Sequence, residues 1–179
     1  MEKVTLYDKT FVSFIPHEDI LAATEKVSSR INDCYRGAED IPVVLCVMNG
    51  ALLFAGELIP RLNFPLEVMT VKLASYEGTH STGVIRELSG ITGEVKGRRV
   101  IVVEDIVDTG ATVEYISKSL KEKGAADVKI CTMLLKPEVY KRGIPLDFVA
   151  MEIPNRFIVG FGLDYNEIGR NLKDIYVLE

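Results

Sequence analysis

Short unbroken apolar runs alternate along this chain with segments whose apolar residues recur at helical spacing. Residues 42–47 and 100–103 carry no charged side chain, which is the pattern of strands buried on both faces. Residues 17–36 instead repeat apolar side chains three and four positions apart and end before Gly37, as a helix does. This alternation predicts an α/β fold with a mostly parallel central sheet flanked by helices.

The same reasoning assigns the remaining elements and one long loop. Helices are expected at residues 51–62 and 110–124, and strands at 66–75, 128–135, 148–151, 157–161 and 175–178. Residues 76–96 are rich in Gly, Ser and Thr and have no periodicity, so they are expected to form a long loop that is either functional or disordered. Ligands bind beyond the carboxyl ends of strands in such sheets, which directs attention to the segments that follow each strand.

Bulk properties narrow the class of protein. A chain of 179 residues favours one domain, spanning 1–179. The net charge is −5, so the chain is not expected to have the basic surface that nucleic-acid binding needs. The N-terminus has no continuous apolar core of a signal peptide, and no apolar run reaches the roughly 18–20 residues that cross a bilayer. We therefore expect a cytoplasmic protein that binds neither nucleic acid nor membrane.

The cysteines and histidines do not form a metal-binding pattern. Cys34, Cys46 and Cys131 include no C-x-x-C pair, and we expect them to be buried, reduced thiols. The two histidines are His17, expected at a helix start, and His80, expected to face solvent in the long loop. Without Cys–His clustering, the sequence does not predict a zinc site.

The segment 104–112 carries the strongest site signal, because it follows a buried strand and opens a helix. Thr109, Gly110 and Thr112 bring hydroxyls and unhindered N–H groups to the helix N-terminus, where partial positive charge favours a phosphate. Glu104 and Asp105 would repel a phosphate unless they bind ribose hydroxyls or Mg²⁺. Asp108 could serve as a base or as an acidic helix cap. A helix cap does not explain two adjacent carboxylates at the end of an apolar strand.

Three other phosphate-binding or phospho-transfer motifs do not fit. The chain has no G-x-x-x-x-G-K-[ST] string, so it lacks a P-loop. The string that begins at Gly160 has Tyr165 where the last glycine of a dinucleotide fingerprint belongs. The Asp105-x-x-Asp108 spacing also differs from that of a phosphoaspartate enzyme.

E-D-I-V-D-T-G-A-T after an apolar strand resembles the signature of the type I phosphoribosyltransferases, which bind 5-phosphoribosyl 1-pyrophosphate. Further strings, in order from about Phe11 to Leu178, are similar to the hypoxanthine(-guanine) phosphoribosyltransferases within that family: C-V-M-N-G, K-L-A-S-Y-E-G-T-H-S-T-G, L-L-K-P and E-I-P-N-R-F-I-V-G-F-G-L-D-Y-N-E-I-G-R-N-L. The last string is specific to that family within the superfamily.

The resemblance implies a single phosphoribosyltransferase domain with a small hood and a long mobile loop. It implies a Mg²⁺-dependent purine-salvage enzyme that converts hypoxanthine, and guanine as well, to IMP or GMP and releases pyrophosphate. It also implies a homodimer or a homotetramer, and nothing else in the sequence bears on the oligomeric state.

The resemblance assigns the sugar and phosphate contacts. Glu104 and Asp105 would bind the ribose 2′ and 3′ hydroxyls directly or through Mg²⁺, and Asp164 would bind the Mg²⁺ that bridges the pyrophosphate. Asp108 would lie near N7 of the base as general base. The residues that would hold the 5′-phosphate are Thr109, Gly110, Ala111 and Thr112.

The resemblance also assigns the purine contacts. Lys136 would donate to the exocyclic oxygen at C6, and Phe157 would stack on the base. The Ile158 backbone would read the base edge, and Leu163 would be a further purine contact. Taken alone, Lys136 reads as a solvated residue at a strand end and Phe157 reads as a core residue.

Asn49 and Gly50 would form the pyrophosphate loop, with Arg170 as a further pyrophosphate contact. In the family the peptide bond before the first of these positions, here Met48–Asn49, can be cis. The family often has Lys at the position of Asn49, so this chain would bind pyrophosphate there through backbone N–H groups.

The mobile loop would close over the site and exclude water from a reactive sugar cation. The resemblance places Ser75, Tyr76, Ser81, Thr82 and Gly83 in that loop.

Three alternatives stay open on the sequence alone. The chain could be a regulatory relative that binds RNA, although it lacks a stretch dense in Lys and Arg. It could transfer to xanthine, adenine or a pyrimidine, although Lys136 with Phe157 favours a 6-oxopurine. It could bind a sugar phosphate without catalysis, which the presence of Asp108 and Asp164 disfavours. The preference between hypoxanthine and guanine is not readable.

Overall fold

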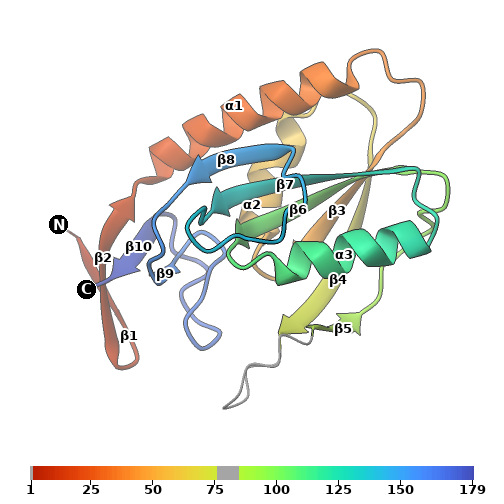
Figure 1. Cartoon of the computed structure of the whole chain (residues 1–179). Helices are drawn as coiled ribbons and strands as arrows, with labels where there is room; N and C mark the ends of the chain where they lie inside the picture. The colour runs from red at the N-terminus through yellow and green to blue at the C-terminus, as the bar shows by residue number, and fades with distance from the viewer. Residues whose placement is uncertain (1, 76–84) are drawn as a thin grey trace.

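The computed structural model describes residues 2–75 and 85–179. Its central feature is a six-stranded sheet with the order β5-β4-β3-β6-β7-β8 (Figure 1). Strands β4, β3, β6, β7 and β8 are parallel, and β5 is antiparallel to β4. The strands are β3 (Val43–Met48), β4 (Glu67–Ser75), β5 (Ile85–Ser89), β6 (Arg99–Val107), β7 (Asp127–Leu135) and β8 (Phe148–Glu152). The predicted mostly parallel sheet is confirmed.

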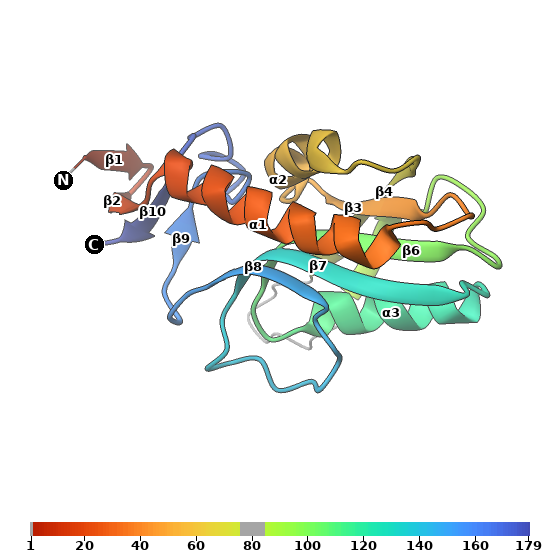
Figure 2. The same ribbon diagram turned by 90° about the horizontal axis from the view of Figure 1, so that it is seen from above.

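Helices cover both faces of this sheet, as Figure 2 shows. Helix α1 (His17–Tyr35), helix α2 (Leu52–Leu58) and the 3₁₀ turn η1 (Ile59–Arg61) lie on one face, and α3 (Ala111–Glu122) lies on the other. Strand β3 is buried on both sides, because Val44 and Cys46 join the core under α1 and α2 while Val43, Leu45 and Val47 join the core under α3. This two-sided burial explains why the strand reads as an unbroken apolar run.

A second, four-stranded antiparallel sheet forms a hood beyond the carboxyl ends of the parallel strands (Figure 1). Its order is β1-β2-β10-β9, with β1 (Lys3–Leu6), β2 (Lys9–Ile15), β9 (Ile158–Val159) and β10 (Ile175–Leu178). The two ends of the chain lie side by side here, because Glu179 N donates to the Thr10 carbonyl at 3.1 Å. The hood therefore brings the segment after β9 over the edge of the central sheet where ligands bind.

Several expected elements differ from those observed. The sequence did not predict β1 and β2, whose stability depends on pairing with β10 at the other end of the chain. The expected loop 76–96 contains β5, an edge strand that pairs with β4. The expected strand 157–161 is shorter, because Gly160 and Phe161 have φ values of +99° and +46° and turn the chain. The expected helix 51–62 ends in a 3₁₀ turn that contains Pro60.

The three thiols do not share one environment. Cys46 and Cys131 are buried, as expected, and burial raises the pKa of the Cys46 thiol to about 11. Cys34 is exposed, because the next residue, Tyr35, occupies the buried position at the end of α1. In the described part of the chain, no helix is both long and apolar enough to cross a membrane.

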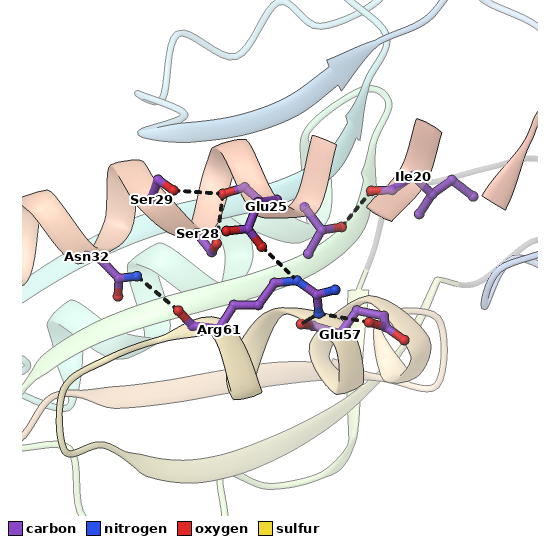
Figure 3. Close-up of polar contacts among 8 residues, drawn as sticks. Ile20, Glu25, Ser28, Ser29, Asn32, Glu57 and Arg61 are labelled. Atoms are coloured by element: carbon purple, nitrogen blue, oxygen red, sulfur yellow. Dashed lines mark hydrogen bonds and ion pairs between the residues drawn. The ribbon is translucent and has the colours of Figure 1, made fainter. Parts of the chain in front are cut away.

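Arg61 links α1 to α2 on the outer face of the molecule (Figure 3). Its Nε donates to Glu25 Oε2 at 3.2 Å, and its Nη1 donates to Glu57 Oε2 at 2.8 Å. Asn32 Nδ2 donates to the Arg61 carbonyl at 2.9 Å, and Asn32 Oδ1 accepts from Asn63 N at 2.9 Å. Exposed ion pairs contribute only about 0–1 kcal/mol each, but together these contacts fix α2, the helix that follows the Asn49 loop.

Candidate functional site

Two cavities open near the carboxyl ends of the central strands. The larger, of about 840 Å³, lies between the ends of β3 and β4 and the segment 157–170. The smaller, of about 350 Å³, is formed by residues 104–113. The larger cavity is bordered by Met48, Asn49, Lys72, Leu73, Leu88, Phe157, Asp164, Tyr165, Asn166, Glu167 and Arg170. Both cavities lie where the strand topology predicts a ligand site.

Glu104 and Asp105 form a pair of carboxyl groups at the smaller cavity, Glu104 buried and Asp105 partly buried. The sequence suggested that these two residues follow a strand that ends at residue 103. In the structure β6 continues to Val107, so both residues belong to the strand. Asp105 Oδ1 accepts from Ile106 N at 2.7 Å, whereas Glu104 Oε2 has no hydrogen-bond partner among the described residues. Burial raises the pKa of both carboxyl groups, and the neighbouring Asp105 charge raises the pKa of Glu104 further. A cation or a hydroxyl donor would satisfy this pair.

Replacing Glu104 with Gln is expected to stabilise the ligand-free protein at neutral and alkaline pH. The pKa of Glu104 in the folded protein lies above its ordinary value of 4.5, so its favourable contribution is complete below pH 4.5 and is lost as pH rises through the folded pKa. The Gln variant removes this penalty. We expect its Tm at pH 8 to be about 2–4 °C above wild type, corresponding to about 1 kcal/mol.

The check is a series of melting curves from pH 4.5 to pH 8. The difference in Tm should shrink toward the acid end, where the wild-type carboxyl is protonated. Glu138→Gln is the matched control, because Glu138 is exposed and borders neither cavity. A Gln variant that melts below wild type at pH 8 would show that the Glu104 charge is stabilised in solution, and would contradict the prediction.

Glycines let the end of β6 and two loops touch at the centre of the site. A Cβ on Gly50 would lie 1.8 Å from Asp105 Oδ2, so only glycine leaves room for that carboxylate. A Cβ on Gly162, which has a φ of +98°, would lie 2.0 Å from the Gly50 carbonyl oxygen. The preceding Met48–Asn49 peptide bond is cis, as expected. The two predicted loop residues Asn49 and Gly50 are thus fixed between β6 and the segment after β9.

Arg170 holds the segment after β9 together. Its Nη1 donates to the Gly162 carbonyl at 2.8 Å, and its Nη2 lies 2.6 Å from Asp164 Oδ1. Asp164 Oδ2 accepts from Glu167 N at 2.8 Å. Asp164 and Arg170, to which the sequence assigned separate ligands, therefore form an ion pair at the wall of the larger cavity.

Asp108 and Lys136 also form an ion pair that the sequence did not predict. Lys136 Nζ lies 2.9 Å from Asp108 Oδ2, and the side chain of Asp108 is 46% exposed whereas that of Lys136 is 9% exposed. Lys136 is therefore not a solvated residue at a strand end. The buried ammonium balances the charge of Asp108 while that carboxylate is ionised, and the half-exposed carboxylate can accept a hydrogen bond or a proton from a bound molecule.

The start of α3 can bind an anion. Gly110 precedes the helix with a φ of +85°, and no side chain caps the first turn. A Cβ on Gly110 would lie 2.4 Å from Tyr140 Cε2, so the chain passes tightly under that ring. Thr109, Ala111 and Thr112 border the smaller cavity with their neighbours. Uncapped N–H groups at this helix end suit a phosphate.

Of the four predicted purine contacts, Phe157 alone borders the larger cavity. Its ring is 46% exposed and stands edge-on to Tyr165, with centroids 5.9 Å apart. Ile158 and Leu163 are buried and border neither of the two cavities. The N–H and carbonyl of Leu163 are both bonded to Gly160, at 3.0 Å each. The structure therefore does not bring Leu163 to the cavity.

Sequence reasoning missed several residues that border the larger cavity. These are Lys72, Leu73, Leu88, Tyr165, Asn166 and Glu167. Lys72 could have been identified by predicting the register of β3 with β4, because Lys72 pairs with Met48 in that register. Of the predicted mobile-loop residues, Ser75 ends β4, and Tyr76, Ser81, Thr82 and Gly83 lie outside the described residues.

The carboxylates of the site do not converge on one Mg²⁺ position. They offer two separate positions, one at Glu104 and Asp105 and one at Asp164. Within residues 2–75 and 85–179, no three His, Cys, Asp or Glu side chains converge into a metal-binding group. Mg²⁺ usually takes one or two carboxylates together with substrate phosphates and water. The unpartnered Glu104 Oε2 beside Asp105 suits one such position, and Asp164 suits another.

Known proteins are similar to this chain in sequence and in fold. The phosphoribosyl transferase domain family matches residues 15–166. A Streptococcus pneumoniae protein named hypoxanthine-guanine phosphoribosyltransferase is 39% identical over 166 residues, which cover 92% of this chain and 91% of that protein. A Staphylococcus aureus hypoxanthine phosphoribosyltransferase superposes with a TM-score of 0.86 at 30% identity, over 93% of this chain and 90% of the other. A Trypanosoma cruzi hypoxanthine phosphoribosyl transferase gives a TM-score of 0.87 at 30% identity, over 98% and 95%. The chain belongs to the phosphoribosyl transferase family.

Proposed function

We propose that this protein transfers the 5-phosphoribosyl group from 5-phosphoribosyl 1-pyrophosphate to hypoxanthine and guanine, giving IMP or GMP and pyrophosphate in purine salvage. One observation carries the proposal. The Glu104–Asp105 pair, of which Glu104 is buried without a partner for one oxygen, lies between the uncapped start of α3 and the Asn49–Gly50 loop. Such a site offers separate places for a phosphate, a ribose and a second phosphate group. The choice of hypoxanthine and guanine as the acceptor bases follows the names of the relatives.

The sugar phosphate is held by α3 and β6. The 5′-phosphate binds to the N–H groups and hydroxyls at the start of α3, from Thr109, Gly110, Ala111 and Thr112. The ribose hydroxyls donate to Glu104 and Asp105, which line the smaller cavity. This contact partners the otherwise unsatisfied Glu104 oxygen.

Mg²⁺ is the proposed cofactor. Glu104 and Asp105 would hold it at the ribose, and Asp164 would hold it at the pyrophosphate. Bound there, it would neutralise the charge that develops on the leaving pyrophosphate. Arg170, which already lies at 2.6 Å from Asp164, turns the remaining donors of its guanidinium toward the same polyanion.

The reaction displaces pyrophosphate from C1 of the ribose by N9 of the purine. The C1–O bond breaks as the N9–C1 bond forms, and positive charge develops on the sugar. The Glu104–Asp105 carboxylates favour that charge. The base must lose a proton, and Asp108 accepts it near N7. Lys136 moves from Asp108 toward the oxygen at C6 as the carboxylate is protonated.

Phe157 positions the base. Its half-exposed ring at the cavity wall offers a flat apolar face, and Tyr165 supports the ring edge-on. Lys136 at the C6 oxygen then favours a 6-oxopurine over adenine, because adenine offers an amino group where the ammonium needs an acceptor.

The test is a spectrophotometric assay with 5-phosphoribosyl 1-pyrophosphate and, separately, hypoxanthine, guanine, xanthine and adenine. We expect turnover with hypoxanthine and guanine, lost on chelating Mg²⁺ and restored when Mg²⁺ is returned. Binding of the sugar phosphate without turnover of any purine would overturn the proposal. It would favour a sugar-phosphate-binding role or a regulatory relative, which RNA filter binding would then separate.

We also propose that the enzyme acts in the cytoplasm as a homodimer or homotetramer. Size-exclusion chromatography coupled to light scattering measures the mass of the assembly directly. A mass of one chain, 19.9 kDa, across the working concentrations would contradict an oligomer.

A further inference from the structure

Lys72 lies beside the cis peptide at the larger cavity, and the family resemblance assigned it no role. In the parallel pairing of β3 with β4, Lys72 is the register partner of Met48, which precedes Asn49. Neighbouring strands lie about 4.8 Å apart, so the backbone at Lys72 runs directly alongside the start of the loop. Lys72, Met48 and Asn49 all border the same cavity.

An irregularity in the edge of the sheet accompanies this placement. Lys72 pairs with Ser89 and Leu73 pairs with Glu87, so the register skips Leu88. A residue inserted in this way bends the strand and redirects nearby side chains. Lys72 and Leu73 are adjacent in β4 and would ordinarily point to opposite faces, yet both border the larger cavity, and so does Leu88.

Among the described basic residues at the larger cavity, Arg170 has ion-pair partners and Lys72 has none. The charged side chains at the wall are Lys72, Asp164, Glu167 and Arg170. The Arg170 guanidinium is already paired with Asp164 at 2.6 Å and with Glu167 at 3.6 Å. Lys72 is exposed and forms no ion pair with any side chain in the described part of the chain. Asn49 contributes no charge, so without Lys72 the wall would be net negative.

We propose that Lys72 is a further side chain that binds the pyrophosphate group in this protein, supplying from β4 the positive charge that Asn49 does not supply from β3. The inference rests on the proposed function, because it concerns the polyanion that the reaction releases. A lysine ammonium is a compact charge with three donors on a flexible stem, which suits a phosphate group of variable position.

Calorimetry with inorganic pyrophosphate and Mg²⁺ tests the proposal without any turnover. Lys72→Gln should weaken pyrophosphate binding by about tenfold to a hundredfold, as expected for loss of a contact to a charged group. Lys72→Arg, which keeps the charge, should bind close to wild type. Lys123→Gln is the matched control, because Lys123 is exposed at the end of α3 and borders neither cavity. It should bind like wild type.

Steady-state kinetics add a second readout. Lys72→Gln should raise KM for 5-phosphoribosyl 1-pyrophosphate, and for pyrophosphate in the reverse reaction, while KM for hypoxanthine stays near wild type. Pyrophosphate affinity within about twofold of wild type in Lys72→Gln would overturn the inference, since that is under 0.5 kcal/mol. A Lys72→Arg variant as weak as Lys72→Gln would overturn it too.

The two proposals fail in distinguishable ways. If no purine is turned over but pyrophosphate binding still depends on Lys72, the proposed function fails and this inference stands. If wild type turns over hypoxanthine while Lys72→Gln binds pyrophosphate normally, the proposed function stands and this inference fails.

Discussion

Asp108→Asn is expected to lower kcat by about 10²–10⁴-fold, the range typical for removal of a general base. The loss should appear in kcat with hypoxanthine, while the binding of 5-phosphoribosyl 1-pyrophosphate stays near wild type. Asp108 follows β6 and contacts Lys136 at 2.9 Å, whereas the proposed 5′-phosphate contacts begin one residue later at the start of α3. Proton transfer and phosphate binding are therefore separable by substitution.

The Asn variant is chosen because it keeps an oxygen that accepts from Lys136. Lys136 is buried, and leaving its ammonium without a partner would cost stability by itself. Melting curves should therefore show an intact fold in Asp108→Asn. Glu114→Gln is the matched control in α3, because Glu114 pairs with Arg142 at the surface and should leave kcat near wild type.

The comparison of two quantities decides the role of Asp108. The sugar-phosphate affinity is measured by calorimetry and kcat by the spectrophotometric assay on the same preparations. If both fall by the same factor, Asp108 holds the substrate and does not take its proton. If kcat is unchanged, another group accepts the proton and the base assignment is wrong.

Gly162→Ala is expected to damage folding and pyrophosphate binding together. The new Cβ would lie 2.0 Å from the Gly50 carbonyl oxygen, and the φ of +98° is one that alanine rarely adopts. Backbone has to move, because no flexible side chain separates the two loops. We expect a loss of about 2–4 kcal/mol, which lowers Tm by about 4–16 °C in a chain of this length.

The same displacement reaches the proposed chemistry, because Gly50 is where Asp105 packs and Asn49 borders the larger cavity. KM for 5-phosphoribosyl 1-pyrophosphate should rise in the variant even at temperatures where it stays folded. Pyrophosphate calorimetry at such a temperature separates the effect on binding from the effect on stability.

Gly56→Ala is the matched control for a glycine substitution. Gly56 lies inside α2 and has no positive φ. A Cβ added at Gly56 would have no atom of another part of the described chain within 4 Å. Alanine there should be neutral or stabilising by up to about 1 kcal/mol. A Gly162→Ala variant that melts and binds like wild type would show that the loops are not in tight contact in solution.

The local pattern of the sequence determined the central sheet, its two-sided burial and the helix after Asp108. Each depends on residues close together in the chain. An unbroken apolar run such as 42–47 specifies burial on both faces, and helical spacing specifies one buried face. The carboxylates and small residues of 104–112 could be read as one site for the same reason, because a strand and the helix after it place consecutive residues around one phosphate.

The tertiary structure decided which distant residues meet. Lys136 pairs with Asp108 across 28 positions, and Lys72 reaches the Asn49 loop only through the register of β3 with β4. The hood required β2 to pair with β10 from the opposite end of the chain. No local propensity encodes such pairings, because they depend on long-range register and on packing that all elements settle together. The sequence therefore located the proposed phosphate site, and the folded chain determined which charges surround it.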